Sequence, residues 1–561
     1  MFYSLYHKKT KYTTYSIKFF DTFLKTTDIG SIYKKILYNL YSFYVEKKEI
    51  FCYYLLVWIL SGRSVDFMYK LGFDNDKYIK TQSEQIRKRI AHFGGKLYME
   101  FGGKLFDDNH ASRVLPGFEP DSKLRMLLEL KNEAEIVIAV SAGALESKKR
   151  RGDLNITYDM ECLRLIDLFR NVGLYVGSVV ITQYNHQEAA DSFKATLNSL
   201  GVNCFIHYRI EGYPANVEKI VSDNGFGKNE YVETTRKLVV VTAPGPGSGK
   251  MATCLSQLYH EHLRGVSAGY AKFETFPIWN LPLSHPVNLA YEAATADLND
   301  VNMIDPFHFD AYGEVTVNYN RDIEVFPVLG TIFERIYGTC PYKSPTDMGV
   351  NMAGNCIVDN DAVEDAAKEE IVRRYYTALC ERRKGRDTSK EIEKIEILMN
   401  KVGVSPSKRI VAVKAKETAR ETGAPAAAIE LKDGTVLTGK TKNLLGATSA
   451  LILNALKHLS GIDDELTLLP SYLIEPVQGL KVNFLGSANP RLHVDEVLIA
   501  LSVNAATDKN AEKALAALPL LKGSEAHCSV ILSERDSAII RKLGINLTTE
   551  PDYENDNLYH L

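Results

Sequence analysis

One stretch near the middle of the chain constrains the fold more than any other. Lys237–His262 reads KLVVVTAPGPGSGKMATCLSQLYHEH. Its valine-rich start predicts a strand buried on both faces, and the apolar repeat after Lys250 predicts a helix. The glycines between them let backbone N–H groups approach a ligand, while the helix start and Lys250 supply positive charge. This order of strand, glycine-rich loop and helix is typical of a phosphate site in an α/β fold.

The loop departs from the complete Walker A pattern, in which GxxxxGK is followed by serine or threonine. Pro244 stands at the first glycine position, and Met251 stands where the magnesium-binding hydroxyl is expected. Thr253 replaces that hydroxyl only if the first helical turn is displaced. The cofactor-binding residues predicted from this loop are Gly245, Gly247, Ser248, Gly249, Lys250 and Thr253. The alternative is a strand-to-helix turn that binds nothing.

Strands and helices alternate through the part of the chain that contains this loop. Strands are predicted at 97–101, 135–140, 174–182, 202–210 and 238–242, and helices at 78–93, 119–131, 158–169 and 187–200. The pattern predicts right-handed crossovers and a Rossmann-like, mainly parallel sheet with helices on both faces. Ligands of such sheets lie beyond the carboxyl ends of the strands. The loops at Gly102, Ser141, Thr182 and Gly245 are therefore expected to converge on one pocket.

Changes of composition divide the chain into four parts. Residues 1–67 form an atypical extension, 68–335 the Rossmann-like domain, 336–403 a loop and helical linker region, and 404–561 a smaller C-terminal α/β domain with mixed strands. Met68 is interpreted as the natural start, and the alternative for the preceding residues is a membrane-surface anchor. Mass spectrometry of the native N-terminus tests this interpretation.

Composition excludes several classes of protein. The formal net charge of −3 over 561 residues gives no basic excess for nucleic acid, and the eight cysteines never form CxxC. Scattered thiols in a chain of this length indicate reduced cysteines and a cytoplasmic location. The apolar run 50–60 is shorter than the roughly 20 residues of a membrane span, and no membrane contact is expected for residues 68–561. A homo-oligomer is left open.

Three polar segments are candidates for chemistry. Residues 264–360 carry few clear repeats and are predicted to be long loops that hold or cover a binding site. Within them, Asp347 is a candidate general base or metal ligand and Asn351 its polar neighbour, with an aspartate at a helix N-cap as the alternative. The segment from Asp107 to Arg113 adds Asp108 and His110 as catalytic candidates, with an Asx-capped turn as the alternative.

Metal chemistry has one weak candidate. Asp305 follows a short apolar stretch and is the candidate magnesium ligand for ATP or another nucleotide, with a loop-capping aspartate as the alternative. His260 and His262 are two positions apart, whereas the zinc motif HExxH places its histidines on one helix face. The sequence therefore does not support a zinc peptidase.

Long segments of the chain resemble a bacterial family defined by a domain of unknown function, number eighteen forty-six. They include LGFDNDKYIKTQSEQIRKRI, GGKLFDDNHASRVLPGFEPDSK, VTAPGPGSGKMATCLSQLYHEH, FETFPIWNLPLSHPVNLAYEAATADLNDVNMIDPFH and SPTDMGVNMAG. The resemblance runs from about Met68 to Pro551. It implies a cytosolic multidomain α/β protein with a helical segment between its two domains, and no established reaction. Some members carry the label of an ATP-dependent zinc protease.

The predicted fold is α/β, with a phosphate loop that resembles a P-loop. The leading function is an enzyme that binds a nucleotide or another phosphorylated small molecule at Gly245–Lys250. A non-catalytic nucleotide or metabolite sensor and a structural protein are the alternatives. The missing hydroxyl after Lys250 favours the sensor over the enzyme.

Overall fold

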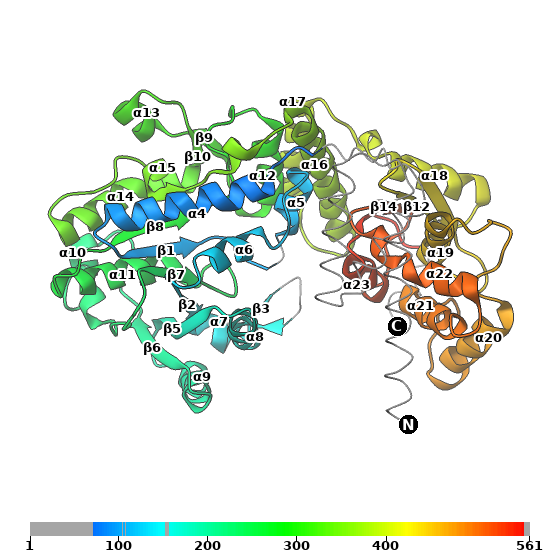
Figure 1. Cartoon of the computed structure of the whole chain (residues 1–561), viewed down its shortest axis with the longest axis horizontal. Coiled ribbons are helices and arrows are strands. Elements are labelled where there is room, and N and C mark those ends of the chain that lie inside the picture. The colour runs from blue at the N-terminus through cyan, green and yellow to red at the C-terminus, as the bar shows by residue number, and fades with distance from the viewer. Residues whose placement is uncertain (1–70, 104, 107, 152–155, 555–561) are drawn as a thin grey trace, which may run out of the picture. The chain divides into compact units, whose positions relative to one another are not determined.

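The computed structural model describes residues 71–103, 105–106, 108–151 and 156–554. The atypical extension 1–67, the interpreted start at Met68 and the candidate Asp107 lie outside these residues. Labels follow Figure 1, which marks helices and strands in chain order.

Seven of the described strands form one parallel sheet in the order β11-β8-β1-β7-β2-β5-β6. These strands are β1 (Leu97–Phe101), β2 (Ala134–Ser141), β5 (Tyr175–Tyr184), β6 (Asn203–Tyr208), β7 (Leu238–Thr242), β8 (Gly269–Phe273) and β11 (Gly349–Val350). Every residue of β7 is buried, as the valine run predicts. The predicted mainly parallel sheet is confirmed.

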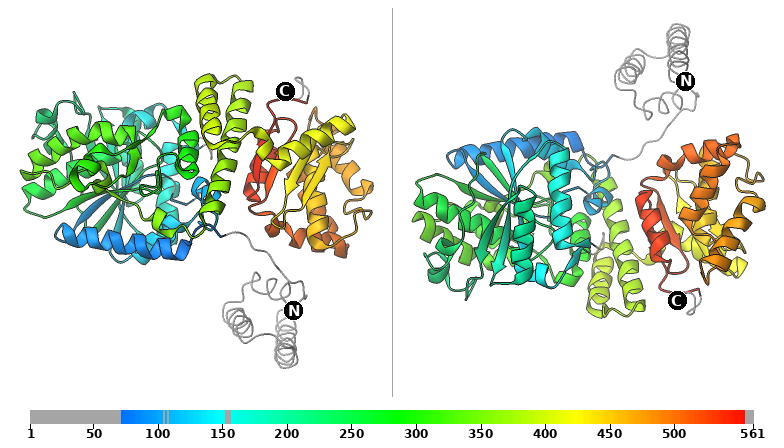
Figure 2. Two further views of the ribbon diagram at one scale, coloured as in Figure 1. Left: turned by 90° about the horizontal axis from the view of Figure 1, so that it is seen from above. Right: turned by 90° about the horizontal axis from the view of Figure 1, so that it is seen from below.

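Helices cover both faces of this sheet (Figures 1 and 2). Side chains alternate along β1, so Leu97 and Met99 lie in one core while Tyr98 lies in the other. The first core also contains α4 (Asn75–His92), α6 (Ser122–Glu129), α8 (Tyr158–Asn171) and α9 (Glu188–Ser199), and the second contains α11 (Lys250–Leu263) and α14 (Asn320–Tyr337). The strand period of two thus produces a three-layer domain.

The segment 264–360 is more regular than the sequence suggests. It contributes the strands β8 and β11 to the large sheet, and β11 lies within the range assigned to the linker. It also holds α12 (Pro286–Ala294), β9 (Asn302–Ile304), α13 (Pro306–Tyr312), β10 (Val317–Tyr319), α14 and α15 (Pro345–Met348). The prediction of long loops was wrong here because short strands and proline-started helices give no clear period. Two strands of the sheet were therefore missed.

Two long helices follow the large sheet, and a smaller sheet completes the chain. The helices are α16 (Asn360–Arg383) and α17 (Ser389–Val402), as their charged helical pattern predicts. The smaller sheet has the order β13-β12-β14-β15 and mixes antiparallel with parallel pairs. Its strands are β12 (Ala426–Glu430), β13 (Val436–Lys440), β14 (Glu525–Cys528) and β15 (Asn546–Thr549). A smaller C-terminal α/β domain is thereby confirmed.

The remaining elements are short connections and the helices that cover the smaller sheet. They are α5 (Asn109–Val114), α7 (Ala142–Glu146), β3 (Arg150–Arg151), β4 (Ile156–Thr157), α10 (Val217–Ile220), α18 (Ile410–Thr422), α19 (Ala447–Ser460), α20 (Ser471–Gly479), α21 (Val494–Asn504), α22 (Lys509–Ala516) and α23 (Glu534–Lys542). None of the helices within the described ranges combines the length and apolar character that crossing a membrane requires.

Candidate functional site

The glycine-rich loop lies at the point where the strand order along the sheet changes direction. The adjacent strands β1 and β7 are followed by crossovers to opposite sides, to β2 and β8 respectively. In open α/β sheets, ligands bind at such a reversal, beyond the carboxyl ends of the strands. The loop 243–249 follows β7 there, and α11 begins directly after it at Lys250. The topology thus places the loop at the edge where a ligand site is expected.

Two glycines give the loop its shape. Gly247 and Gly249 have φ angles of 77° and 78°, in the left-handed region that other residues rarely adopt. A Cβ on Gly249 would lie 2.9 Å from the hydroxyl oxygen of Thr182, so this position also needs glycine for close packing. The Thr182 hydroxyl donates a 2.8 Å hydrogen bond to the Ser248 carbonyl oxygen, which fastens the loop to β5.

The side-chain hydroxyls of Ser248 and Thr253 donate hydrogen bonds to backbone carbonyls of the loop. The Ser248 hydroxyl donates to the Gly245 carbonyl oxygen at 2.9 Å, and the Thr253 hydroxyl donates to the Gly249 carbonyl oxygen at 3.0 Å. Both bonds preserve the turn into α11. Thr253 lies in the first turn of α11 and uses its hydroxyl proton on the Gly249 carbonyl, while Met251 supplies no hydroxyl. The loop therefore lacks a hydroxyl at the position where the Walker A pattern has its magnesium ligand.

Two cavities flank the loop, and Lys250 lines both. The first has a volume of about 500 Å³ and is bounded by Gly103, Gly245 and Tyr158 among others. The second, of about 820 Å³, is bounded by Thr182 and Glu100 among others. The loops after β1 and β7 bound the first cavity, and those after β5 and β7 bound the second, so the four loops do not converge on one pocket as expected. Ser141 instead caps α7, with its hydroxyl accepting from the Ala144 N–H.

A chain of charged side chains extends from Lys250 across the neighbouring strands. The Lys250 Nζ lies 3.9 Å from a carboxylate oxygen of Glu100 on β1. Glu100 accepts a 2.8 Å hydrogen bond from the Tyr270 hydroxyl on β8. Lys272, also on β8 and paired in register with Glu100, forms ion pairs with Glu274 at 2.6 Å and with Asp322. Sequence reasoning missed these residues, although charges at the end of buried strands were a usable signal.

The carboxyl group of Glu274 has a pKa raised into the neutral range. Burial raises the pKa of Glu274 from 4.5 to about 7, Asp322 and Glu100 add to the rise, and Lys272 opposes it. Burial acts against the ionised form because the protein interior solvates charge poorly. Lys272 itself stays protonated, because attraction by Asp322, Glu274 and Glu100 raises its pKa despite burial.

The raised pKa of Glu274 predicts a loss of stability as pH rises from the acidic range to neutrality. Between pH 4.5 and 7 the folded chain binds a proton that the unfolded chain has released, so the free energy of unfolding falls as pH rises. We expect Glu274→Gln to reduce this fall by about 1–3 kcal/mol in urea unfolding measured across that range. The exposed Glu188→Gln serves as control and should keep the wild-type profile. An unchanged profile in Glu274→Gln would contradict the assignment.

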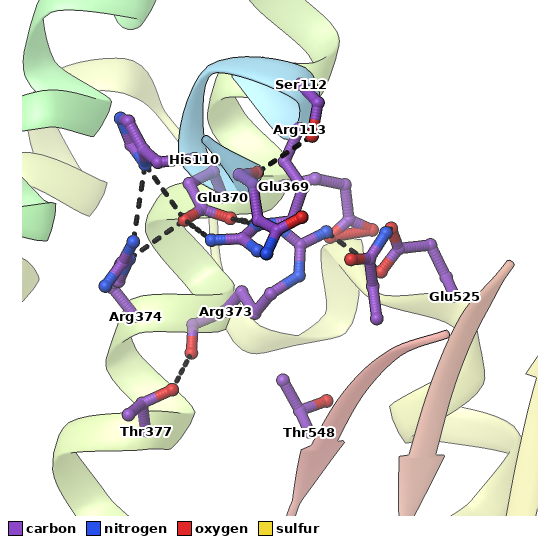
Figure 3. A network of polar contacts seen from close by, with 12 residues as sticks. His110, Ser112, Arg113, Glu369, Glu370, Arg373, Arg374, Thr377, Glu525 and Thr548 are labelled. Atoms are coloured by element: carbon purple, nitrogen blue, oxygen red, sulfur yellow. Dashed lines mark hydrogen bonds and ion pairs between the residues drawn. The ribbon is translucent and has the colours of Figure 1, made fainter. Parts of the chain in front are cut away.

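The candidates Asp108 and His110 lie at the start of α5. Asp108 caps α5 through the Ala111 N–H and pairs with the Lys123 Nζ at 2.7 Å. His110 Nδ1 lies 3.2 Å from a carboxylate oxygen of Glu370 on α16 (Figure 3). Burial lowers the pKa of His110, and Arg374 and Arg113 lower it further. Neither residue bounds the two cavities beside the loop, and the present contacts of both connect elements of the fold.

The candidates Asp305 and Asp347 lie at the contacting helices α13 and α15, whereas Asn351 follows β11. Asp305 caps α13 through the His308 N–H and accepts from the Thr346 hydroxyl at 2.7 Å. Asp347 accepts from the Tyr312 hydroxyl at 2.7 Å, and the Asn351 amide donates to backbone carbonyls of the loop after β8. These contacts match the loop-capping alternative for Asp305. None of the three bounds the cavities beside Lys250.

The polar side chains Glu261 and His260 of α11 are held by contacts within the protein. Glu261 accepts from the Tyr98 hydroxyl at 2.6 Å and pairs with Lys96, while His260 Nε2 lies 2.8 Å from the Asn229 carbonyl oxygen. Both side chains therefore hold the fold together around α11. Across the part of the chain that the structure describes, no three His, Cys, Asp or Glu side chains are grouped to hold a metal ion.

Comparison with known proteins covers nearly all of the described chain. The family model described as "Domain of unknown function DUF1846, N-terminal" matches residues 71–403, and its C-terminal counterpart matches 407–559. The chain is 56% identical over 492 residues to a UPF0371 protein of Streptococcus uberis, covering 88% of this chain and 100% of the relative. A UPF0371 protein of Streptococcus pyogenes serotype M5 matches with the same identity and coverage.

Proposed function

The chain belongs to the DUF1846 family, and for this member we propose that the glycine-rich loop binds the phosphate group of a nucleotide or another phosphorylated small molecule. The observation that carries the proposal is the position of Lys250, at the start of α11 and between two cavities. Left-handed Gly247 and Gly249 precede it in the loop. A helix start and a lysine together favour an anion at this point.

The two cavities support an enzyme rather than a simple binding protein. Each has the size of a small-molecule site, at about 500 and 820 Å³. Because Lys250 lines both, a phosphate on the loop would lie next to a second ligand in the other cavity. Lysine at this point would neutralise charge during transfer of a group between the two ligands. Glu100, beside Lys250 and bounding the second cavity, is placed to accept a proton from the acceptor.

A non-catalytic sensor of the same ligand class is the second candidate. The observation that favours it is the missing hydroxyl, since Met251 follows Lys250 and the Thr253 hydroxyl is bonded to Gly249. Without that hydroxyl the loop offers no ordinary first ligand for the magnesium that ATP hydrolysis uses. Turnover that depends on magnesium would support the enzyme, and tight binding without turnover would support the sensor.

A thermal-shift screen tests the proposal directly. The panel contains nucleotides and sugar phosphates, each with and without magnesium, and inorganic phosphate as the smallest probe. A ligand at a hundred times its dissociation constant should stabilise the folded chain by about 2.7 kcal/mol. The proposal predicts a shift with at least one phosphorylated compound and none with its dephosphorylated form. An absence of any shift across the panel would leave the loop as a structural turn.

Glu100 should weaken anion binding at Lys250. Its carboxylate lies 3.9 Å from the Lys250 Nζ and competes with a phosphate for the same charge. We therefore expect Glu100→Gln to bind the screened ligand more tightly, roughly tenfold or about 1.4 kcal/mol, in isothermal titration calorimetry. The exposed Glu465→Gln in the C-terminal domain should bind as wild type. Weaker binding by Glu100→Gln would show that the carboxylate contacts the ligand favourably.

A further inference from the structure

One face of the C-terminal domain exposes an unusual amount of apolar surface. It lies on α20, on the adjoining π-helical turn (Leu480–Phe484) with the following Leu485, and on α21, and α20 contacts both of the other elements (Figure 1). Phe484 and Leu485 are 81% and 73% exposed, more than any other large apolar side chain of the described residues. The exposed apolar residues of this α20–α21 face are Tyr472, Leu480, Val482, Phe484, Leu485, Ile499 and Val503. A gathering of exposed apolar side chains on contacting elements is typical of an interaction site.

The spacing along α21 places two exposed apolar residues on one side of this helix. Ile499 and Val503 are four positions apart, so they lie on the same side of the helix. Val497 and Leu501 on the same helix are buried in the C-terminal core, so α21 has an inner and an outer apolar side. A helix that only covers a core needs one such side. The folding of a single chain therefore does not require the apolar residues on the outer side of α21.

We propose that the α20–α21 face is a dimer interface that a second copy of this chain covers by two-fold symmetry. An aromatic side chain presents about 150–250 Å² and an aliphatic one roughly 60–120 Å², so the seven side chains, between 38% and 81% exposed, present on the order of 600 Å². Two such faces together bury on the order of 1,200 Å², the lower end of the range for a stable interface. A two-fold axis lets the same patch meet itself, which is the commonest arrangement of soluble oligomers.

The charges around the face disfavour a membrane surface as its occupant. The ionisable residues of α20, the turn and α21 include Glu475, Asp495 and Glu496 and a single lysine, Lys481. Lys481 is buried, with its Nζ 3.0 Å from a carboxylate oxygen of Glu496. Helices that lie on anionic lipid carry lysine and arginine beside their apolar side. Asp495 and Glu496 are in turn paired with Arg535, at 2.8 and 3.1 Å, so these charges are neutralised within the chain. A face without free basic residues on these elements is compatible with a protein partner.

Light scattering coupled to size-exclusion chromatography tests the dimer with the full chain. We expect wild type to have twice the 62.9 kDa mass of one chain and Phe484→Asp to have the mass of one chain. The matched control is Phe309→Asp, because Phe309 on α13 is 50% exposed and lies outside the proposed interface. This control should remain dimeric. Because Phe484 and Phe309 are largely exposed to solvent, neither replacement should disturb the fold of a single chain. Phe309→Asp should melt at the wild-type temperature, and Phe484→Asp should differ from wild type only by the stabilisation that dimerisation adds.

Three results would overturn the proposal. A wild-type chain that stays monomeric at all concentrations would show that no second copy covers the face. An oligomer that Phe309→Asp dissociates and Phe484→Asp does not would place the interface elsewhere. If Phe484→Asp fails to fold, Val503→Asp on α21 replaces it, and an unchanged mass in that folded variant would also contradict the interface.

Discussion

Replacing Lys250 with alanine is expected to remove most of the thermal stabilisation that a phosphorylated ligand gives the wild-type chain. Lys250 is the first residue of α11 and bounds both cavities beside the glycine-rich loop. A charge-assisted hydrogen bond to phosphate contributes about 1.5–3 kcal/mol, so the dissociation constant should rise by one to two orders of magnitude. The backbone donors of Gly247 and Gly249 would remain and would account for residual binding.

The measurement is the ligand-dependent shift in melting temperature, read beside the melting temperature of each variant alone. The matched control is Lys414→Ala, because Lys414 is an exposed lysine of the C-terminal domain that pairs only with Glu417 among the described residues. Lys414→Ala should keep the full ligand shift. A full shift in Lys250→Ala would mean that the ligand binds elsewhere, and the proposal for the loop would be abandoned.

Replacing Glu370 with glutamine is expected to destabilise the fold by about 3–5 kcal/mol. Glu370 on α16 is fully buried and accepts two hydrogen bonds from Arg113, at 2.8 and 2.9 Å, and one from Arg374 at 2.9 Å (Figure 3). It also pairs with Arg373 and contacts His110. A neutral amide would leave three guanidinium groups around it without their shared counter-charge. Removing one partner of a buried ion pair costs far more than the pair contributes.

The same replacement should loosen contact with the smaller sheet. Arg373 also pairs with Glu525 on β14 at 2.8 Å, and Glu525 pairs with the fully buried Arg409 at 2.9 Å. Glu370 therefore holds in place an arginine that joins α16 to β14. Urea unfolding measures the loss, and the exposed pair variant Glu417→Gln is the control, with an expected change within about 0.5 kcal/mol. A loss below 1 kcal/mol in Glu370→Gln, roughly that of a surface pair, would contradict this account.

Acid should reduce the effect of the Glu370 replacement. Arg113, Arg374 and Arg373 hold the pKa of Glu370 well below 4.5 although burial opposes them. A carboxyl group whose pKa is lower in the folded chain than in the unfolded chain stabilises the fold at pH values above its unfolded pKa. This stabilisation is lost as pH falls towards the pKa of the folded chain. The stability difference between wild type and Glu370→Gln should therefore be largest near neutral pH and shrink in acid.

Local features of this chain could be predicted because they depend on neighbouring residues. The strand Leu238–Thr242 has the predicted bounds, and α11 begins at Lys250 where the loop residues place it. The hairpin of β12 and β13 also follows from its Asp433–Gly434 turn. The strands β8 and β11 were missed because both are short and one has only two residues. A buried pair of residues at a sheet edge gives no period to detect.

The chemistry of the candidate site depends on contacts between distant parts of the chain. The sequence by itself determined the glycine-rich loop, its missing magnesium hydroxyl and the alternation that makes a parallel sheet, because these follow from backbone conformation and side-chain period. Only the tertiary structure decided that Glu100 faces Lys250 and that Glu274 has a pKa of about 7. It also decided that Glu370 pairs with arginines of two helices, Arg113 of α5 and Arg374 of α16. Charge interactions and desolvation act through space, so their strength is set by which residues the fold packs together.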